Sequence, residues 1–355
     1  MKEIRAFFKR KDIEFSLHRY FIDAMGAMAQ GLFCTLLVGT ILNTLGSQFG
    51  IPFLKEPVVN DLTVGDLASA MVGPGMAIAI GNALHAPGLV LFSLIPVGYA
   101  ANMMGGAGGP LAVFFIAIIA AECGKLVSKE TKIDILVTPI VTILAGIGAA
   151  SLIAAPIGAA AKAVGQAIMW ATELQPLLMG IVVSVLMGIA LTLPISSAAI
   201  CASFGLVGLA GGAAVAGCCA QMVGFAVMSF RENRWGGLVA QGIGTSMLQM
   251  PNIVKNPKVW IPPILASAIT GPLATCIFRL EMNGAPVSSG MGTCGFVGQI
   301  GVYTGWVATG KAITAMDWIG LALICFLLPG ILSWLFGAVL RKWGWIKEND
   351  LKLEL

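Results

Sequence analysis

Residues 279–293 read RLEMNGAPVSSGMGT, a polar and glycine-rich stretch inside an otherwise apolar sequence. Its glycines, proline, hydroxyls, amide and carboxylate are typical of a break in a helix, where backbone and side chains offer hydrogen bonds. Residues 241–252, QGIGTSMLQMPN, have the same character, and the two stretches form the densest polar cluster of the chain. At membrane depth, such breaks are tolerated where they are buried in protein or line a cavity.

The surrounding sequence has the composition of an integral membrane protein. Of its 355 residues, 57% are hydrophobic and 11% are charged, whereas soluble domains carry roughly a quarter charged residues. Several apolar runs have the length needed to cross a bilayer, namely residues 24–44, 110–121 with their neighbours, 135–157, 177–193 and 319–340. We therefore expect an all-α integral membrane protein with about ten embedded helices.

Four stretches, two of which include most of the polar cluster, are too polar or too kinked for simple spans, and they predict helix breaks or re-entrant hairpins. They are residues 68–87, 102–110, 236–257 and 281–299. The segment 196–230 is too long for one ordinary span, which indicates two shorter helices.

Basic residues predict the ends of the membrane domain. Residues 1–19 contain six Lys or Arg and no signal-peptide pattern, so we expect a basic, amphipathic cytoplasmic lead-in. A transmembrane domain is predicted over residues 20–341 and a cytoplasmic C-terminal tail over residues 342–355. Both termini are then cytoplasmic.

Pairs of similar segments hint at a two-fold internal repeat. A Met-Gly pair opens an apolar run at Met25 and again at Met179, and residues 70–74 resemble residues 246–251. Two similar halves with the binding site between them are a frequent plan among transporters.

Other functions lack the residues they need. The chain has no Walker-type phosphate loop, and its glycine-rich residues 105–109 lack the flanking strand and acidic residue of a dinucleotide-binding motif. Two histidines and eight cysteines without a C-x-x-C pair argue against a catalytic triad and a structural zinc site. The basic residues at span ends indicate the lipid bilayer and not nucleic acid. We expect no catalytic residues, no metal and no cofactor.

Glu281 is the first candidate for solute binding, because an intramembrane carboxylate is costly and is by default functional. The alternative is that Glu281 pairs with Arg279 in a cytoplasmic loop and anchors a turn. Neutral amides and hydroxyls suit a polyhydroxylated solute, since each sugar hydroxyl both donates and accepts. The further candidates of this kind are Asn283, Gln241, Thr245, Gln249, Asn252 and Gln299.

Three residues of the first half are candidates for solute binding, and each also has a second, structural interpretation. His85 either binds solute or carries a proton, or it caps a helix end beside Pro87. Asn82 and Asn102 are placed similarly, as solute ligands or as helix caps.

Longer motifs resemble a known family. Residues 231–252 (RENRWGGLVAQGIGTSMLQMPN), 258–272 (KVWIPPILASAITGP) and 290–299 (GMGTCGFVGQ) are similar to phosphotransferase-system IIC-like membrane proteins. The subgroup is EIIC type 2, which includes the perfringolysin-regulator-like proteins. Residues 196–231, with the run GCCAQMVGF, continue a resemblance that extends over nearly the whole chain. It implies a IIC-like fold with re-entrant hairpins, usually a homodimer, in the plasma (inner) membrane of a bacterial cell.

The resemblance also implies a function. In glucose-type IIC proteins an acidic residue in a hairpin motif holds the sugar hydroxyls, and Glu281 is the nearest match in a motif that is not identical. We expect no IIA or IIB domain in this chain, so we expect it to be at most the permease component, served by separate partners, or to transport without phosphorylation. We expect a transporter of a sugar or sugar-like polar solute that works by alternating access. The alternative is a membrane-embedded solute sensor that regulates gene expression without net transport.

Overall fold

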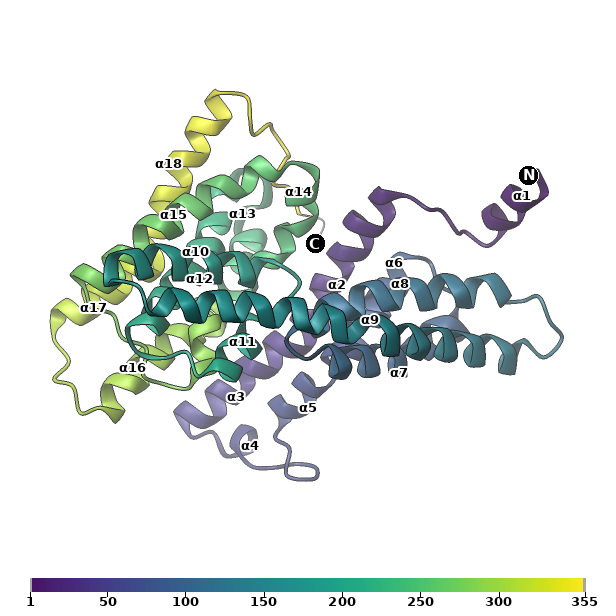
Figure 1. The fold of residues 1–355 in the computed structure, drawn as a ribbon, viewed down its shortest axis with the longest axis horizontal. Helices are drawn as coiled ribbons and strands as arrows, with labels where there is room; N and C mark the ends of the chain where they lie inside the picture. Colours follow the sequence, from purple (N-terminus) through teal and green to yellow (C-terminus); the bar gives the residue numbers. More distant parts are fainter. Residues whose placement is uncertain (1, 354–355) are drawn as a thin grey trace. The chain divides into compact units, whose positions relative to one another are not determined.

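The chain is almost entirely helical. The computed structural model describes residues 2–353, and within them it forms α-, 3-10- and π-helical segments and no β-strand (Figure 1). The all-α prediction is therefore confirmed. The chain divides into two compact units, residues 1–160 and 161–355, each with its own packing. This division does not test the predicted membrane domain over residues 20–341.

The first unit contains a lead-in helix, a long apolar helix and a helical hairpin. Its elements are α1 (Lys2–Arg10), η1 (Arg19–Ala24), α2 (Met25–Leu32), η2 (Phe33–Leu37), α3 (Val38–Phe49), α4 (Pro52–Lys55), α5 (Val64–Ala70), α6 (Val72–Ala83), α7 (Gly88–Gly105), η3 (Gly106–Gly108), α8 (Gly109–Val127) and most of α9 (Asp134–Thr172). Helix α6 packs against α2, α7 and α8 and forms the centre of this unit.

The second unit is built around α12. Its elements are α10 (Pro176–Thr192), α11 (Ser197–Phe204), α12 (Gly208–Met228), α13 (Phe230–Val239), η4 (Ala240–Gly244), η5 (Ser246–Gln249), α14 (Met250–Lys255), η6 (Pro257–Trp260), α15 (Ile261–Pro272), η7 (Leu273–Ile277), η8 (Pro286–Gly290), η9 (Cys294–Phe296), α16 (Val297–Ala308), α17 (Ala315–Ala322), η10 (Leu323–Leu327) and α18 (Leu328–Lys342). Helices α10, α15 and α18 surround α12, whose small residues are nearly all buried (Figure 1).

Six stretches within the described residues are long and apolar enough to cross a membrane. One of them, Gly88–Val127, contains two helices, because Gly106 has a φ of +52° and turns α7 onto α8. Helices α5 and α6 form a bent pair with an angle of 50°, and α10 is apolar but only 17 residues long. The six stretches, the bent pair and α10 do not confirm the predicted number of about ten embedded helices. The predicted internal repeat is likewise not confirmed.

The structure breaks the helices in all four stretches that the sequence marked as unlike simple spans. The breaks are the bend between α5 and α6, the turn at η3, the short helices from η4 to η6, and the irregular chain before α16. The segment 196–230 is also divided, since Gly205 ends α11 in a left-handed conformation before α12 begins.

Gly212→Ala tests the closest backbone contact of the second unit. A methyl group built at Gly212 would lie 1.6 Å from the Leu280 carbonyl oxygen, so we expect a loss of stability of about 1–3 kcal/mol or more. Thermal unfolding in detergent measures the change. Gly236→Ala is the matched control, because a methyl group there meets nothing within 4 Å. Equal melting temperatures for the two variants would show that the Leu280 carbonyl does not lie against Gly212.

Candidate functional site

The irregular chain that follows η7 is held inside the second unit by its backbone. Arg279 has a φ of +45°, and beyond it Met282 pairs with Gly208 in an antiparallel β-bridge, which requires extended backbone there. The Met282 N–H donates to the Gly208 carbonyl at 2.9 Å, and the Gly208 N–H donates back to the Met282 carbonyl at 2.8 Å. The Leu280 N–H donates to the Ala274 carbonyl at 2.8 Å. The backbone polar groups of the break thus find partners within the unit, as a buried irregular segment requires.

The extended conformation separates Glu281 from its buried neighbours. Successive side chains of extended backbone point to opposite sides, and here Leu280 and Met282 are buried while Glu281 is exposed. The Asn283 Nδ2 donates to the Glu281 Oε2 at 3.0 Å. The ion pairs of the described residues do not include one between Glu281 and Arg279. The Glu281 carboxylate therefore keeps further lone pairs for other donors.

Hydroxyl groups attach the rest of the break to α11 and its C-terminal loop. The Ser197 Oγ donates to the Gly290 carbonyl at 2.7 Å, and the Ser289 Oγ donates to the Leu206 carbonyl at 2.6 Å. The Gln299 Nε2 contacts the Cys219 Sγ at 3.2 Å, while its Oε1 is buried and accepts no hydrogen bond from the described residues. Of the predicted site residues, Gln299 is the one with an unsatisfied buried acceptor.

The predicted amides of residues 241–252 bond to one another. The Gln249 Nε2 donates to the Gln241 Oε1 at 2.8 Å, and the Asn252 Nδ2 donates to the Gln249 Oε1 at 2.8 Å. Thr245 caps η5 by accepting from the Met247 N–H at 3.1 Å. The structure thus brings Gln241, Gln249 and Asn252 into one buried cluster and gives Thr245 a capping role.

The same cluster binds the C-terminal tail of the chain. The Gln249 Nε2 donates to the Leu351 carbonyl at 3.1 Å, and the Asn252 Nδ2 donates to the Lys352 carbonyl at 2.9 Å. Asn233 adds two bonds, one to the Leu351 carbonyl at 2.7 Å and one from the Leu353 N–H at 2.8 Å. In this conformation, carboxamide side chains fix the tail in place.

The first-half candidates lie at two ends of α6. His85 follows α6 with a φ of +55°, and its Nδ1 lies 3.0 Å from the Asp12 Oδ2. Asn82 is exposed one turn earlier, near the same end. Asn102 lies on α7 beside Gly73, at the other end of α6. Nine residues of helix separate Asn82 from Gly73, about 14 Å, so the structure does not bring Asn102 to the other two.

A buried group of charges beside His85 was not predicted. The Lys125 side chain is 2% exposed, and its Nζ lies 3.2 Å from the Glu122 Oε2. It also donates to the carbonyls of Leu84 at 2.9 Å and Asp12 at 2.6 Å. The spacing i, i+3 of Glu122 and Lys125 at the end of an apolar run was the available signal, since charges in such runs are rare.

The same charges dock the N-terminal lead-in onto the first unit. The buried Arg19 donates to the two Asp12 carboxylate oxygens at 3.1 and 2.6 Å. Arg10 and Lys11 pair with Glu130, and the Lys11 ammonium also donates to the Ser128 carbonyl. The Arg19 guanidinium, assisted by His85, holds the pKa of the Asp12 carboxyl at about 2, below its usual 3.8.

Comparison with known families identifies the class of this membrane protein. A family model described as phosphotransferase system, EIIC, matches residues 22–353, nearly the whole chain. The chain therefore belongs to the EIIC type 2 family, and the resemblance stated from its motifs is confirmed. No match was found among curated proteins or among solved structures. The family is one of membrane sugar-permease components, which work with IIA and IIB partners.

The carboxamide contacts of the tail can be tested with carboxypeptidase. Asn233→Ala removes two hydrogen bonds to residues 351 and 353, so we expect release of C-terminal residues several-fold faster than from the wild type. Mass spectrometry follows the digestion. Lys347→Ala serves as the control, because its side chain is exposed and its removal leaves these bonds intact. A rate unchanged by Asn233→Ala would show that these bonds do not hold the tail.

Docking of the lead-in depends on the Asp12 charge. Asp12→Asn should speed tryptic cleavage after Lys9, Arg10 and Lys11, and Glu56→Gln, an exposed carboxylate outside this cluster, should leave the rate unchanged. The pKa of Asp12 is lowered in the folded state. Its contribution to the stability of the docked lead-in is therefore complete above about pH 4 and disappears as the pH falls toward 2. Wild-type protection is therefore constant from pH 8 to pH 5. A gradual loss across that range would contradict this assignment.

Proposed function

We propose that this EIIC family member carries a sugar or sugar-like polar solute across the membrane by alternating access, with Glu281 and Asn283 as its first solute ligands. The observation that carries the proposal is an exposed carboxylate bonded to a neighbouring amide on a segment with a fixed backbone. At a break between largely apolar membrane helices, a carboxylate is by default a candidate for function.

The chemistry of the pair suits vicinal hydroxyl groups. An ionised carboxylate only accepts hydrogen bonds, and the Asn283 amide supplies both an acceptor oxygen and donor hydrogens. Hydrogen bonds to a charged acceptor are shorter and stronger than those between neutral groups. Two adjacent sugar hydroxyls could thus donate to Glu281 while one of them accepts from Asn283. Gln299 of α16, whose buried Oε1 accepts no hydrogen bond from the described residues, is proposed as a further ligand.

The remaining candidates receive different roles in this proposal. Gln249 and Asn252 hold the tail in the present conformation, and Gln241 accepts from Gln249. All three become solute ligands only in a state where the tail has left. Thr245 keeps its capping role. In the first unit, His85 beside Asp12 is the group suited to carry a proton, with Asn82 beside it, and Asn102 stays a separate candidate ligand.

The setting of transport follows from the family and from the charge pattern. We propose a homodimer in the plasma membrane of a bacterial cell, with both termini cytoplasmic and with separate IIA and IIB proteins as partners. Basic residues at the docked lead-in and at the end of α18 support this orientation, since cytoplasmic ends of spans are enriched in Lys and Arg.

Glu281→Gln tests the solute site. The change keeps the shape of the side chain and removes its charge, so we expect affinity for the transported solute to fall about tenfold or more. A thermal-shift screen of hexoses, disaccharides and polyols selects the solute, and its uptake into proteoliposomes gives the affinity. Glu348→Gln, an exposed carboxylate of the tail, should leave uptake unchanged. Wild-type uptake and affinity in Glu281→Gln would exclude the assigned role.

A further inference from the structure

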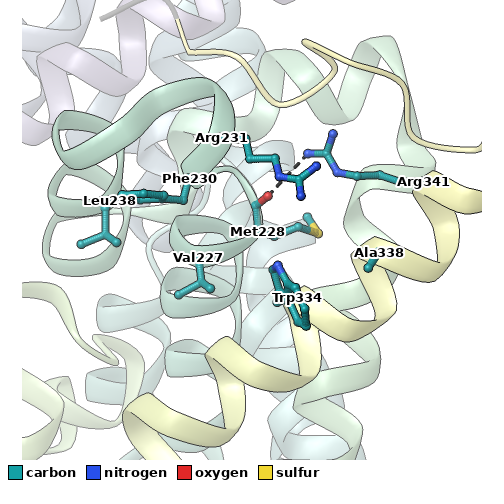
Figure 2. A pocket seen from close by; sticks show the side chains of 9 residues that line it. Val227, Met228, Phe230, Arg231, Leu238, Trp334, Ala338 and Arg341 are labelled. Atoms are coloured by element: carbon teal, nitrogen blue, oxygen red, sulfur yellow. Dashed lines mark hydrogen bonds between the residues drawn. The ribbon is translucent and has the colours of Figure 1, made fainter.

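A pocket of about 390 Å³ lies in the second unit where α12 ends and where α13 and α18 approach it. None of the residues proposed for solute binding belongs to it. Apolar side chains make up most of its wall, together with two arginines and one tryptophan (Figure 2). The lining residues include Val227, Met228, Arg231, Leu238, Trp334 and Arg341.

The two guanidinium groups point toward one another on one side of this pocket (Figure 2). The Arg341 Nη2 donates to the Glu232 Oε1 at 2.6 Å and to the Met228 carbonyl at 3.5 Å. Arg231 is exposed and forms no ion pair with any residue that the structure describes. Two cations beside one carboxylate leave an excess of one positive charge. Like charges at one place repel, so an anion between them would stabilise the arrangement.

The pocket lies at the end of two parallel membrane-spanning candidates. Gly224 of α12 lies beside Ser333 of α18, and Met228 lies beside Gly337, so the two helices run in the same direction. Both end near the pocket, and α18 ends with two basic residues. The Trp334 side chain is 50% exposed. Tryptophan and basic residues are enriched where membrane helices meet the lipid headgroups, which is the depth of lipid phosphates.

We propose that this pocket binds an anionic phospholipid. Its phosphodiester lies between Arg231 and Arg341, and one acyl chain lies along Val227, Leu238 and Trp334. A phosphodiester carries one negative charge, which equals the excess positive charge of the site. Guanidinium groups bind phosphate oxygens through paired hydrogen bonds. Basic pockets between membrane helices bind lipid headgroups in this way.

The shape of the pocket favours a lipid over free phosphate. Inorganic phosphate offers the same oxygens to the arginines, but it leaves the apolar wall without a partner. An acyl chain covers this wall and removes it from water, which stabilises binding by about 0.8 kcal/mol for each buried CH₂ group. The buried Glu232, whose side chain is 4% exposed, fixes Arg341 and is not itself part of the lining.

Native mass spectrometry of the purified protein in a neutral detergent tests the proposal. Dioleoyl-phosphatidylglycerol is titrated into the wild type, Arg231→Gln and Lys342→Gln, with dioleoyl-phosphatidylcholine as the zwitterionic comparison. Arg231→Gln is preferred to a change at Arg341, because it leaves the buried Glu232 paired. Lys342→Gln is the matched control, since Lys342 is an exposed cation next to Arg341 outside the pocket.

We expect one phosphatidylglycerol to bind the wild type and Lys342→Gln alike, with affinity about tenfold weaker in Arg231→Gln. Phosphatidylcholine should bind weakly to all three proteins, and millimolar inorganic phosphate should not displace the bound lipid. Trp334→Phe should remove part of the fluorescence quenching by brominated phosphatidylglycerol. Equal affinities of Arg231→Gln and Lys342→Gln, or displacement of the lipid by inorganic phosphate, would overturn the proposal.

Discussion

The extended backbone at residues 280–282 lies directly against the first turn of α12, and the packing of the second unit depends on this contact. The Leu280 carbonyl occupies the space where a side chain at Gly212 would be, and Met282 and Gly208 exchange two backbone hydrogen bonds. An irregular segment among apolar helices is stable only when its polar groups are satisfied by protein. The glycines at the start of α12 make that possible, because they allow two backbones to approach.

This contact also explains how a carboxylate is presented without being buried. Leu280 and Met282 join the apolar core with Trp306, Val302 and Cys325, so the side chain between them must face away from it. Glu281 is then held at a defined place by neighbours that are rigid, and Asn283 is within hydrogen-bonding distance. A binding group on a supported backbone loses less conformational entropy when a solute binds than one on a mobile loop.

Both described ends of the chain are fixed to the unit in which they lie. The lead-in is held by the ion pair of Asp12 with Arg19 and by the Lys125 ammonium, which donates to the Asp12 backbone carbonyl, and the tail is held by carboxamides. Burial of Lys125 is expensive, and two backbone carbonyls together with Glu122 offset that cost. Charges hold one end and neutral amides hold the other, so salt should weaken the first attachment more than the second.

Composition and apolar runs were sufficient to predict the helical class, four of the six candidate spans of the described residues and the four places where helices break. The motifs between residues 231 and 299 were sufficient for the family. The partners of the polar residues could not be predicted, because hydrogen bonds form between segments distant in sequence. Gln249 and Asn252 have the residue types of a sugar site, yet they bind the tail about 100 residues further along. The spacing of Lys125 and Glu122 in an apolar run was a signal, but only the fold shows that Lys125 donates to the carbonyls of Asp12 and Leu84.

Hydrogen exchange of the protein in lipid nanodiscs tests the central claim most directly. If residues 280–282 are part of the packed unit, the amides of Met282 and Gly208 exchange as slowly as those in the middle of α12, because both are donors in backbone hydrogen bonds. If the segment is a mobile loop, Met282 exchanges within seconds while α12 stays protected. That second result would contradict the account of how Glu281 is held.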